Sequence, residues 1–148
     1  MKIIPGHSIG LFKIGDNLFQ HSLFEKFTET KDGKFEFENL HVRINKEGLI
    51  DLIATYNGEY NGIETGKTFR QIIAEGHVLL YDEFDQVFYL KETDGLCIGK
   101  EYENLAFEEL LDSKIQYINI YDINANREFW QTLKKDFEEI SKSNLADT

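Results

Sequence analysis

Short segments in which apolar and polar residues alternate recur along the chain, and they constrain its fold more than any other feature. Residues 40–44 and 49–56 flank a turn in which Gly48 can take the left-handed conformation. Residues 77–81 and 86–90 flank a second, acidic turn. Each pair of segments predicts a β-hairpin, so we expect a sheet that is mainly antiparallel.

Periodicity predicts one further strand and one helix. Residues 114–121 alternate with a period of two, which is typical of a strand with one buried face. Near the C-terminus, Phe129, Leu133, Phe137 and Ile140 recur at helical spacing and form one apolar stripe. This stripe predicts a C-terminal amphipathic helix.

A motif with two glycines occurs three times, at residues 10–18, 62–69 and 95–102. Each copy has a glycine, a short extended piece, a second glycine, two mostly polar residues and an apolar anchor. The second glycine can take a positive φ, and the polar pair is typical of the start of a helix or turn. We expect a helix after each of the first two copies, because residues 18–27 and 69–73 carry apolar side chains at helical spacing.

These elements together predict the α+β class, with a mainly antiparallel sheet built from hairpins and helices packed on one face. The chain has 148 residues, one proline and no glycine- or serine-rich linker, so residues 1–148 are expected to form a single domain. The polar tail, residues 141–148, is expected to fray. The sequence contains no apolar stretch of about 20 residues and no secretion signal at its N-terminus, so we expect a cytoplasmic protein that does not enter membranes.

Acidic residues are concentrated in one quarter of the chain. The formal net charge is −11, from 27 acidic and 16 basic residues. Residues 75–112 hold eleven acidic side chains against only Lys91 and Lys100, which is a net charge of −9. Such a field repels nucleic acid and anionic membranes and attracts cationic partners. The plain alternative is that the charge serves solubility.

The sequence carries no recognisable catalytic or metal-binding pattern. Residues 61–68 approximate a P-loop, but Asn61 stands where the first glycine belongs and Glu64 would place a negative charge among the phosphate-binding N–H groups. The four histidines lack the close spacing of a zinc-binding helix. Cys97 lies in an apolar run within the acidic quarter, which indicates a structural thiol. We therefore expect a binding protein rather than an enzyme, with no cofactor and no metal site.

Acidic segments that also carry aromatic residues suit protein recognition. Tyr60 lies beside a carboxylate in a glycine-rich loop, and the segment 81–85 places two aromatic residues among three carboxylates on a hairpin tip. Aromatic anchors with neighbouring charge supply binding energy and steer association. An ordinary turn is the alternative interpretation of each segment. The predicted partner-binding residues are Tyr60, Tyr81, Asp82, Glu83, Phe84, Asp85, Glu92 and Asp94.

Two segments in the first half of the chain carry a family resemblance: residues 4–18, IPGHSIGLFKIGDNL, and residues 58–68, GEYNGIETGKT. They resemble small bacterial immunity proteins encoded beside polymorphic or contact-dependent growth inhibition toxins. The glycine-turn-helix pattern is also similar to the repeats of β-lactamase-inhibitor-like domains. The resemblance implies a protein that binds and blocks one toxin domain, often a nuclease with a basic cleft, but no interface residue can be carried over.

The leading hypothesis is a cytoplasmic immunity protein that neutralises a cognate, basic toxin domain by stoichiometric binding through its acidic surface. The alternative is a small enzyme or ligand-binding domain whose site is assembled from distant residues. A concave pocket that holds His41 or His77 with carboxylates would favour this alternative. A third hypothesis is a self-associating structural domain, and the oligomeric state stays open.

Overall fold

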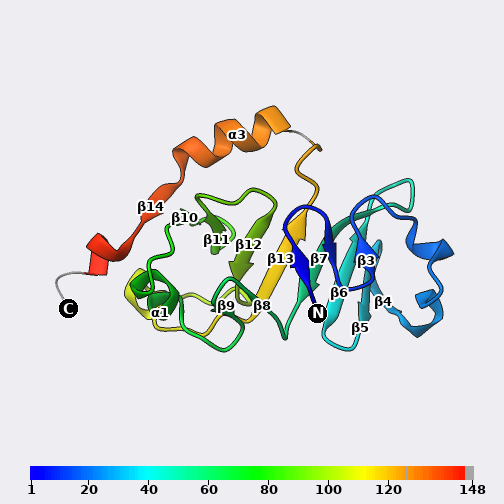
Figure 1. The fold of residues 1–148 in the computed structure, drawn as a ribbon, viewed down its shortest axis with the longest axis horizontal. Helices are drawn as coiled ribbons and strands as arrows, with labels where there is room; N and C mark the ends of the chain where they lie inside the picture. Colours follow the sequence, from blue (N-terminus) through cyan, green and yellow to red (C-terminus); the bar gives the residue numbers. More distant parts are fainter. Residues whose placement is uncertain (126, 146–148) are drawn as a thin grey trace.

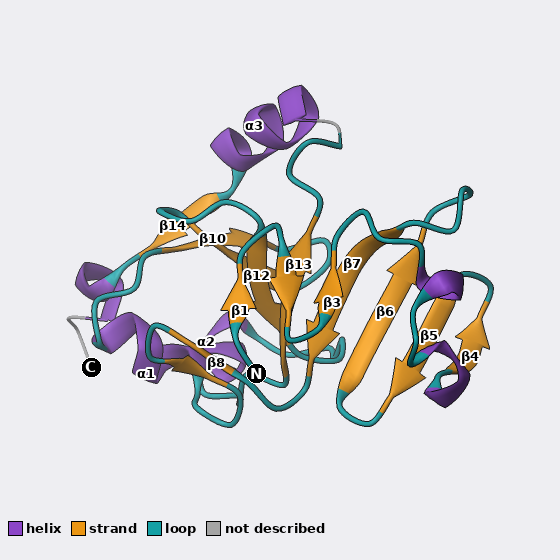
Figure 2. Ribbon diagram, turned by 45° about the vertical axis from the view of Figure 1, so that its right-hand side comes forward, coloured by secondary structure: helices purple, strands orange, loops and turns teal. Residues whose placement is uncertain are grey.

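The computed structural model describes residues 1–125 and 127–145, apart from the side chains of residues 129, 130 and 133. Within this part of the chain, nine antiparallel strands form one long sheet (Figures 1 and 2). In spatial order they are β14 (Glu138–Ile140), β10 (Leu79–Asp82), β11 (Val87–Leu90), β12 (Leu96–Gly99), β13 (Tyr117–Tyr121), β7 (Ile50–Thr55), β6 (Leu40–Ile44), β5 (Lys34–Phe37) and β4 (Thr28–Lys31). Two small sheets join β1 (Ile3–Ile4), β2 (Ser8–Ile9) and β3 (Phe12–Lys13), and β8 (Glu59–Tyr60) and β9 (Ile63–Glu64).

The described helices are short. They are α1 (Phe69–Ala74), α2 (Phe107–Leu111), α3 (Arg127–Asp136) and the 3-10 helices η1 (Leu18–Gln20), η2 (Phe24–Lys26) and η3 (Lys142–Leu145). Strands account for 38% of the residues and helices for 20%, so the predicted α+β class with helices packed on one sheet face is wrong and the fold is mainly β. In the C-terminal tail, η3 brings Leu145 against the core. None of the described helices is long and apolar enough to span a membrane.

Small hairpins cover one face of the long sheet, here called the inner face, where longer helices were expected. The inner face of the long sheet buries Ile9 of β2, Phe12 of β3 and Ile63 of β9 in one core cluster. α1 adds to the same cluster and begins at the expected residue, because the Thr68 side chain accepts a hydrogen bond from Gln71 N and the Gln71 side chain accepts one from Thr68 N. The inner face is thus covered without a long helix.

The helix predicted over residues 18–27 is replaced by η1 and η2. Side chains compete with helical hydrogen bonding at this point, because His21 Nδ1 accepts a hydrogen bond from Leu23 N at 3.0 Å. The backbone of His21 is extended, which ends η1 after one turn. The β4–β5 hairpin follows, with Gly33 at a positive φ in its turn, and sequence analysis did not predict it.

The predicted C-terminal helix is also shorter than expected. α3 ends one residue before Phe137, and Ile140 lies in β14, where it pairs with Leu79. The reason is that β10 would otherwise present unpaired backbone groups at the sheet edge. β14 satisfies these groups and buries Ile140 to 1% exposure. The side chains of Phe129 and Leu133, the other half of the expected stripe, lie outside the described residues.

Two four-stranded meanders meet at the centre of the long sheet. The first half contributes β4 to β7 and the second half contributes β10 to β13, and β7 pairs antiparallel with β13. Ala54 lies opposite Asn119 at the centre of this pairing, and Ile53 lies opposite Ile120. Because the last strands of two like meanders pair antiparallel, the halves are related by a pseudo-twofold axis that passes between Ala54 and Asn119.

One copy of the glycine motif precedes each meander: the first copy precedes β4 to β7 and the second precedes β10 to β13. The two copies have the same local structure. In the first copy Gly15 N donates to Ile50 O at 2.8 Å, and in the second Gly66 N donates to Ile115 O at 2.9 Å. Ile50 N and Ile115 N each donate in return to the carbonyl of the residue after that glycine, at 2.8 and 2.7 Å. The third copy differs, because β12 of the long sheet takes its extended piece. The chain therefore contains an internal structural repeat.

The outer face of the sheet distinguishes the two halves. In the second half it buries Leu80, Val87, Tyr89, Cys97 and Tyr121. Phe137 stacks on the Tyr89 ring, with centroids 5.4 Å apart. The strand registers put Thr28, Lys34, Glu36, His41 and Tyr56 at the equivalent places in the first half. These side chains are polar or amphipathic, so the outer face of the first half can stay exposed to solvent. The apolar outer face of the second half has to be shielded from solvent by another segment.

The repeat makes a matched prediction for Gly15 and Gly66. Their φ values are +93° and +97°, and a Cβ at either position would meet nothing within 4 Å. Only backbone strain then opposes substitution, so Gly15→Ala and Gly66→Ala should each lower the free energy of unfolding by about 1–2 kcal/mol in urea denaturation. Gly66→Asn should cost less, because asparagine tolerates the left-handed region. Equal losses for alanine and asparagine would contradict this account.

Candidate protein-binding groove

An acidic groove lies where the β10–β11 turn meets the junction between α3 and β14, and its volume is about 540 Å³. Five carboxylates and three aromatic rings line it, and none of the lining residues is basic. The lining residues are Tyr81, Asp82, Glu83, Phe84, Asp85, Asp136, Phe137 and Glu138. Pairing of β14 with β10 brings the two segments together, although fifty residues separate them in the sequence.

The aromatic residues of the groove differ in how firmly they are held. The Tyr81 ring packs between Phe88 and Phe107, with centroid distances of 4.9 and 5.1 Å, so it forms a fixed wall. Phe137 is held by its stacking on Tyr89. Phe84 is 88% exposed. Among the large apolar side chains that the structure describes it is the most exposed, so its ring is available to a partner.

Asp82 shapes the turn that presents Phe84. Its side chain is nearly buried, at 5% exposure, and Oδ1 accepts hydrogen bonds from Phe84 N at 3.1 Å and Asp85 N at 3.5 Å. Gln86 closes the turn with a positive φ of 53°. Burial raises the pKa of Asp82, although the N–H groups of the turn oppose this shift. Asp82 therefore acts on the geometry of the groove more than on its exposed charge.

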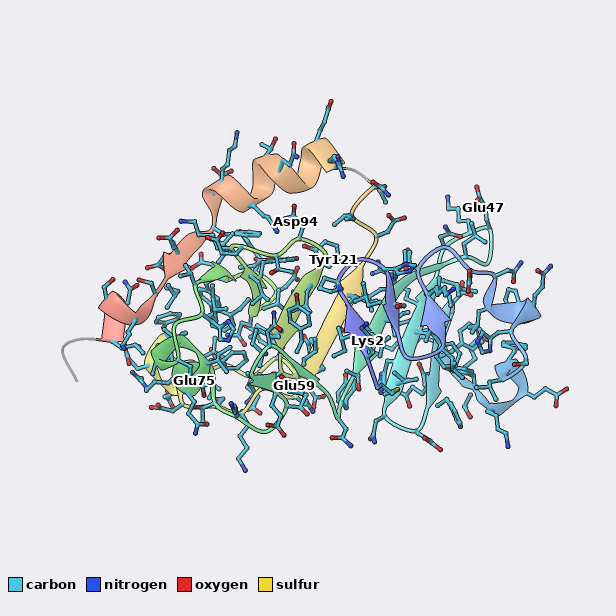
Figure 3. The ribbon with its side chains drawn as sticks, in the orientation of Figure 1. Lys2, Glu47, Glu59, Glu75, Asp94 and Tyr121 are labelled. Carbon is cyan, nitrogen blue, oxygen red and sulfur yellow. The ribbon has the colours of Figure 1, made fainter. Side chains whose placement is uncertain are left out.

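The structure gathers five of the eight predicted partner-binding residues, those of segment 81–85, in this groove. Glu92 and Asp94 lie beyond the opposite end of β11, and the Asp94 carboxylate pairs with Lys134 of α3 at 2.6 Å. Tyr60 lies in the small β8–β9 hairpin, half-buried against the core. Figure 3 shows Asp94 beside α3 near the upper edge of the molecule, and Glu59, the neighbour of Tyr60, near its lower edge.

Sequence analysis missed Asp136, Phe137 and Glu138, which complete the groove. The apolar spacing had assigned Phe137 to the buried stripe of a helix. The local composition held a better signal, because an aromatic residue among carboxylates repeats the pattern of segment 81–85. What placed this segment opposite the turn was strand pairing, which the local pattern does not encode.

Two further hollows share Tyr56 in their lining, and the smaller one also contains Ala54 and Asn119 of the pseudo-twofold axis. One, of about 260 Å³, is on the open outer face and includes His41. The other, of about 770 Å³, is lined by side chains of both charges. His41 Nδ1 lies 3.4 Å from a Glu36 carboxylate oxygen, and both side chains are partly exposed. Cys97 is buried, which raises the pKa of its thiol to about 12 and makes it a poor nucleophile.

Among residues 1–125 and 127–145, no three His, Cys, Asp or Glu side chains are grouped so that they could hold a metal ion.

Comparisons with known proteins gave no match, whether to a family model, to a curated protein or to a solved structure. The groove is therefore interpreted from its own chemistry.

The raised pKa of Asp82 generates a prediction for Asp82→Asn. The pKa of Asp82 is higher in the folded protein than in the unfolded chain. At a pH between these two values the folded protein binds more protons than the unfolded chain does. The contribution of this carboxyl to the free energy of unfolding therefore falls as the pH rises through this range. Asparagine keeps an oxygen for the turn N–H groups but carries no charge. Asp82→Asn should therefore raise the free energy of unfolding at pH 7, and the gain should shrink as the pH falls below the folded pKa.

Asp82→Ala is the matched control, because it removes both the charge and the acceptor. It should lower stability at pH 7 by about 1 kcal/mol through the lost turn hydrogen bonds. Chemical denaturation from pH 3 to pH 8 measures both variants. A pH-independent difference between Asp82→Asn and the wild type would contradict the assigned cause.

Proposed function

We propose that this chain is an immunity protein that acts in the cytoplasm of the cell that makes it, binding and neutralising a basic toxin domain, such as a nuclease. In this proposal it is a stoichiometric inhibitor with no catalytic step and no cofactor. The acidic groove receives a positively charged segment of the toxin domain, and the exposed carboxylates around it steer the encounter.

The observation that carries the proposal is the composition of the groove. Five carboxylates converge there, and no basic residue lines it to neutralise them. Opposite charge on a partner would relieve their mutual repulsion and accelerate association. A surface needed only for solubility gains nothing from gathering its carboxylates around an exposed aromatic ring, that of Phe84.

The rigidity of the turn gives further support. The Asp82 side chain accepts hydrogen bonds from Phe84 N and Asp85 N, which fixes the backbone of the turn, and the Tyr81 ring forms the wall beside it. An anchor that is already held in place loses little conformational entropy on binding. Phe84 therefore suits the role of a binding anchor surrounded by a charged rim.

The alternative of a small enzyme or ligand-binding domain has one observation in its favour. His41 lies at the hollow of about 260 Å³ on the outer face, next to Glu36. The two side chains are 38% and 45% exposed, so solvent screens their interaction. We rank this alternative second for that reason.

A growth test decides between the two functions. The chain serves as bait in a pull-down, and the captured partner is expressed in a bacterial host alone and together with the chain. The proposal expects the partner alone to stop growth and co-expression to restore it. A captured partner that is harmless when expressed alone would overturn the proposal.

Groove variants test the binding surface in the same assay and in stopped-flow binding to that partner. The triple variant Glu83→Gln, Asp85→Asn, Glu138→Gln removes three negative charges from the groove. It should lower the association rate about tenfold at low salt and make that rate less dependent on salt. Phe84→Ser should raise the dissociation rate about tenfold, with little effect on stability because the ring is exposed.

The matched control neutralises three exposed carboxylates of the first half, Glu25, Asp32 and Glu47, and so makes the same change in net charge. It should retain most of the association rate. Equal slowing by the two triple variants would show that total charge, not the groove, drives binding.

A further inference from the structure

The hollow of about 260 Å³ on the open outer face lies over Ala54 of β7. Strand register puts Ala54 between His41 of β6 and Asn119 of β13. Along β7, Leu52 and Tyr56 lie on the same face, because each is two residues away. All five residues line the hollow. It forms here because alanine has a small side chain and its neighbours on this face are larger.

Lys34 and Arg43 line one end of the hollow, opposite each other on β5 and β6. None of the lining residues is a carboxylate. Arg43 Nε donates to Asp51 Oδ1 at 2.8 Å, and the two Nη groups have no hydrogen-bond partner in the described part of the chain. The Lys34 ammonium forms no ion pair with any residue that the structure describes. This end therefore offers positive charge and free N–H donors.

Three rings line the other end. His41 and Tyr56 have ring centroids 4.3 Å apart, and Tyr117 lies 5.6 Å from Tyr56. Rings held against one another form a firm apolar wall, and a ligand ring can pack on such a wall face to face or edge to face.

The two ends differ in electrostatic potential. Burial raises the pKa of the Tyr56 hydroxyl, and the carboxylates of Glu36 and Glu101 raise it further, so negative charge acts at the aromatic end. Arg43 lies opposite Leu52, which is four residues from Tyr56 and so about 13 Å away along the strand. An anionic group is thus favoured beside the two basic residues and disfavoured beside the rings.

The internal repeat shows that the fold does not require these two cations. The strand registers relate Lys34 and Arg43 to Val87 and Gly99 in the second half. The same backbone arrangement forms there with an apolar residue and a glycine. The basic pair is therefore a property of the first half alone.

We infer that this hollow binds a small aromatic carboxylate, in which a short chain joins one ring to the carboxylate group. The carboxylate accepts hydrogen bonds from the two Nη groups of Arg43 and from the Lys34 ammonium, and a planar guanidinium matches its two oxygens. The ring packs on Tyr56 and Tyr117. A volume of about 260 Å³ is small for a ligand pocket, which favours a ligand with a single ring. The inference concerns a surface separate from the acidic groove and does not depend on a toxin as partner.

Nuclear magnetic resonance titration of the full ¹⁵N-labelled chain with hydrocinnamate tests it. The matched probes are hydrocinnamyl alcohol, which keeps the ring without the charge, and butanoate, which keeps the carboxylate without the ring. Hydrocinnamate should shift the backbone amide signals of His41, Ala54 and Tyr56 with a millimolar dissociation constant, about fivefold below that of either matched probe. A peptide that ends in phenylalanine carries the same two groups from a protein source. It should bind no more tightly, because the hollow has room only for one ring and a short chain.

Two variants and one control complete the test. Lys34→Met keeps the aliphatic stem at an exposed position and should weaken hydrocinnamate binding about threefold. Lys46→Met removes the same charge from an exposed turn and should leave the affinity unchanged. Tyr56→Leu should weaken binding about threefold by removing a ring, and the amide signals of the second half verify that this variant folds.

Four outcomes would each overturn the inference. They are equal affinity for hydrocinnamate and its alcohol, equal losses in Lys34→Met and Lys46→Met, tighter binding of the peptide, and no shift at residues 41, 54 and 56. Tighter binding of the peptide would assign the hollow to the C-terminus of a partner protein instead.

Discussion

The antiparallel pairing of β7 with β13 joins the two halves of the molecule, and the other parts of the sheet are placed relative to it. Without this pairing, each four-stranded meander would end in a central strand with unpaired backbone N–H and C=O groups. Opposition of Ile53 and Ile120 across the junction continues the buried inner face from one half to the other. The matched hydrogen bonds of Gly15 and Gly66 then fix where each half begins. One register therefore sets both the core and the pseudo-twofold axis.

The C-terminal segment breaks this symmetry, and the acidic groove is a consequence. β14 pairs with the edge of β10, and Phe137 covers the Tyr89 ring, which the apolar outer face of the second half requires. The same chain path carries Asp136 and Glu138 to the β10–β11 turn. Covering one half of the sheet and concentrating negative charge at its end are thus two results of a single strand pairing. Exposed carboxylates tolerate this crowding, because water and salt screen them.

The part of the fold that could be predicted consists of elements with a strong local signal. The hairpin at residues 40–56 is confirmed, with Gly48 at a φ of +80° in its turn, as is the hairpin with its acidic tip at residues 82–85. The helix expected over residues 69–73 is confirmed as α1, which Thr68 caps. The β4–β5 hairpin was missed because β4 (Thr28–Lys31) is exposed along its whole length and so lacks an apolar alternation. Its pairing with β5, rather than its own side chains, makes it a strand.

The sequence by itself determined the antiparallel character of the sheet, the turns of the two predicted hairpins and the concentration of negative charge, because each of these is encoded by neighbouring residues. Tertiary structure alone decided which carboxylates share a surface. Segment 81–85 meets residues 136–138 through strand pairing, whereas Glu92 and Asp94, closer in sequence, lie beyond the far end of β11. Tertiary structure also decided that residues 137–140 leave the helix. An apolar stripe at helical spacing indicates only that its side chains become buried. Pairing with the edge strand β10 gives Ile140 both burial and backbone hydrogen bonds.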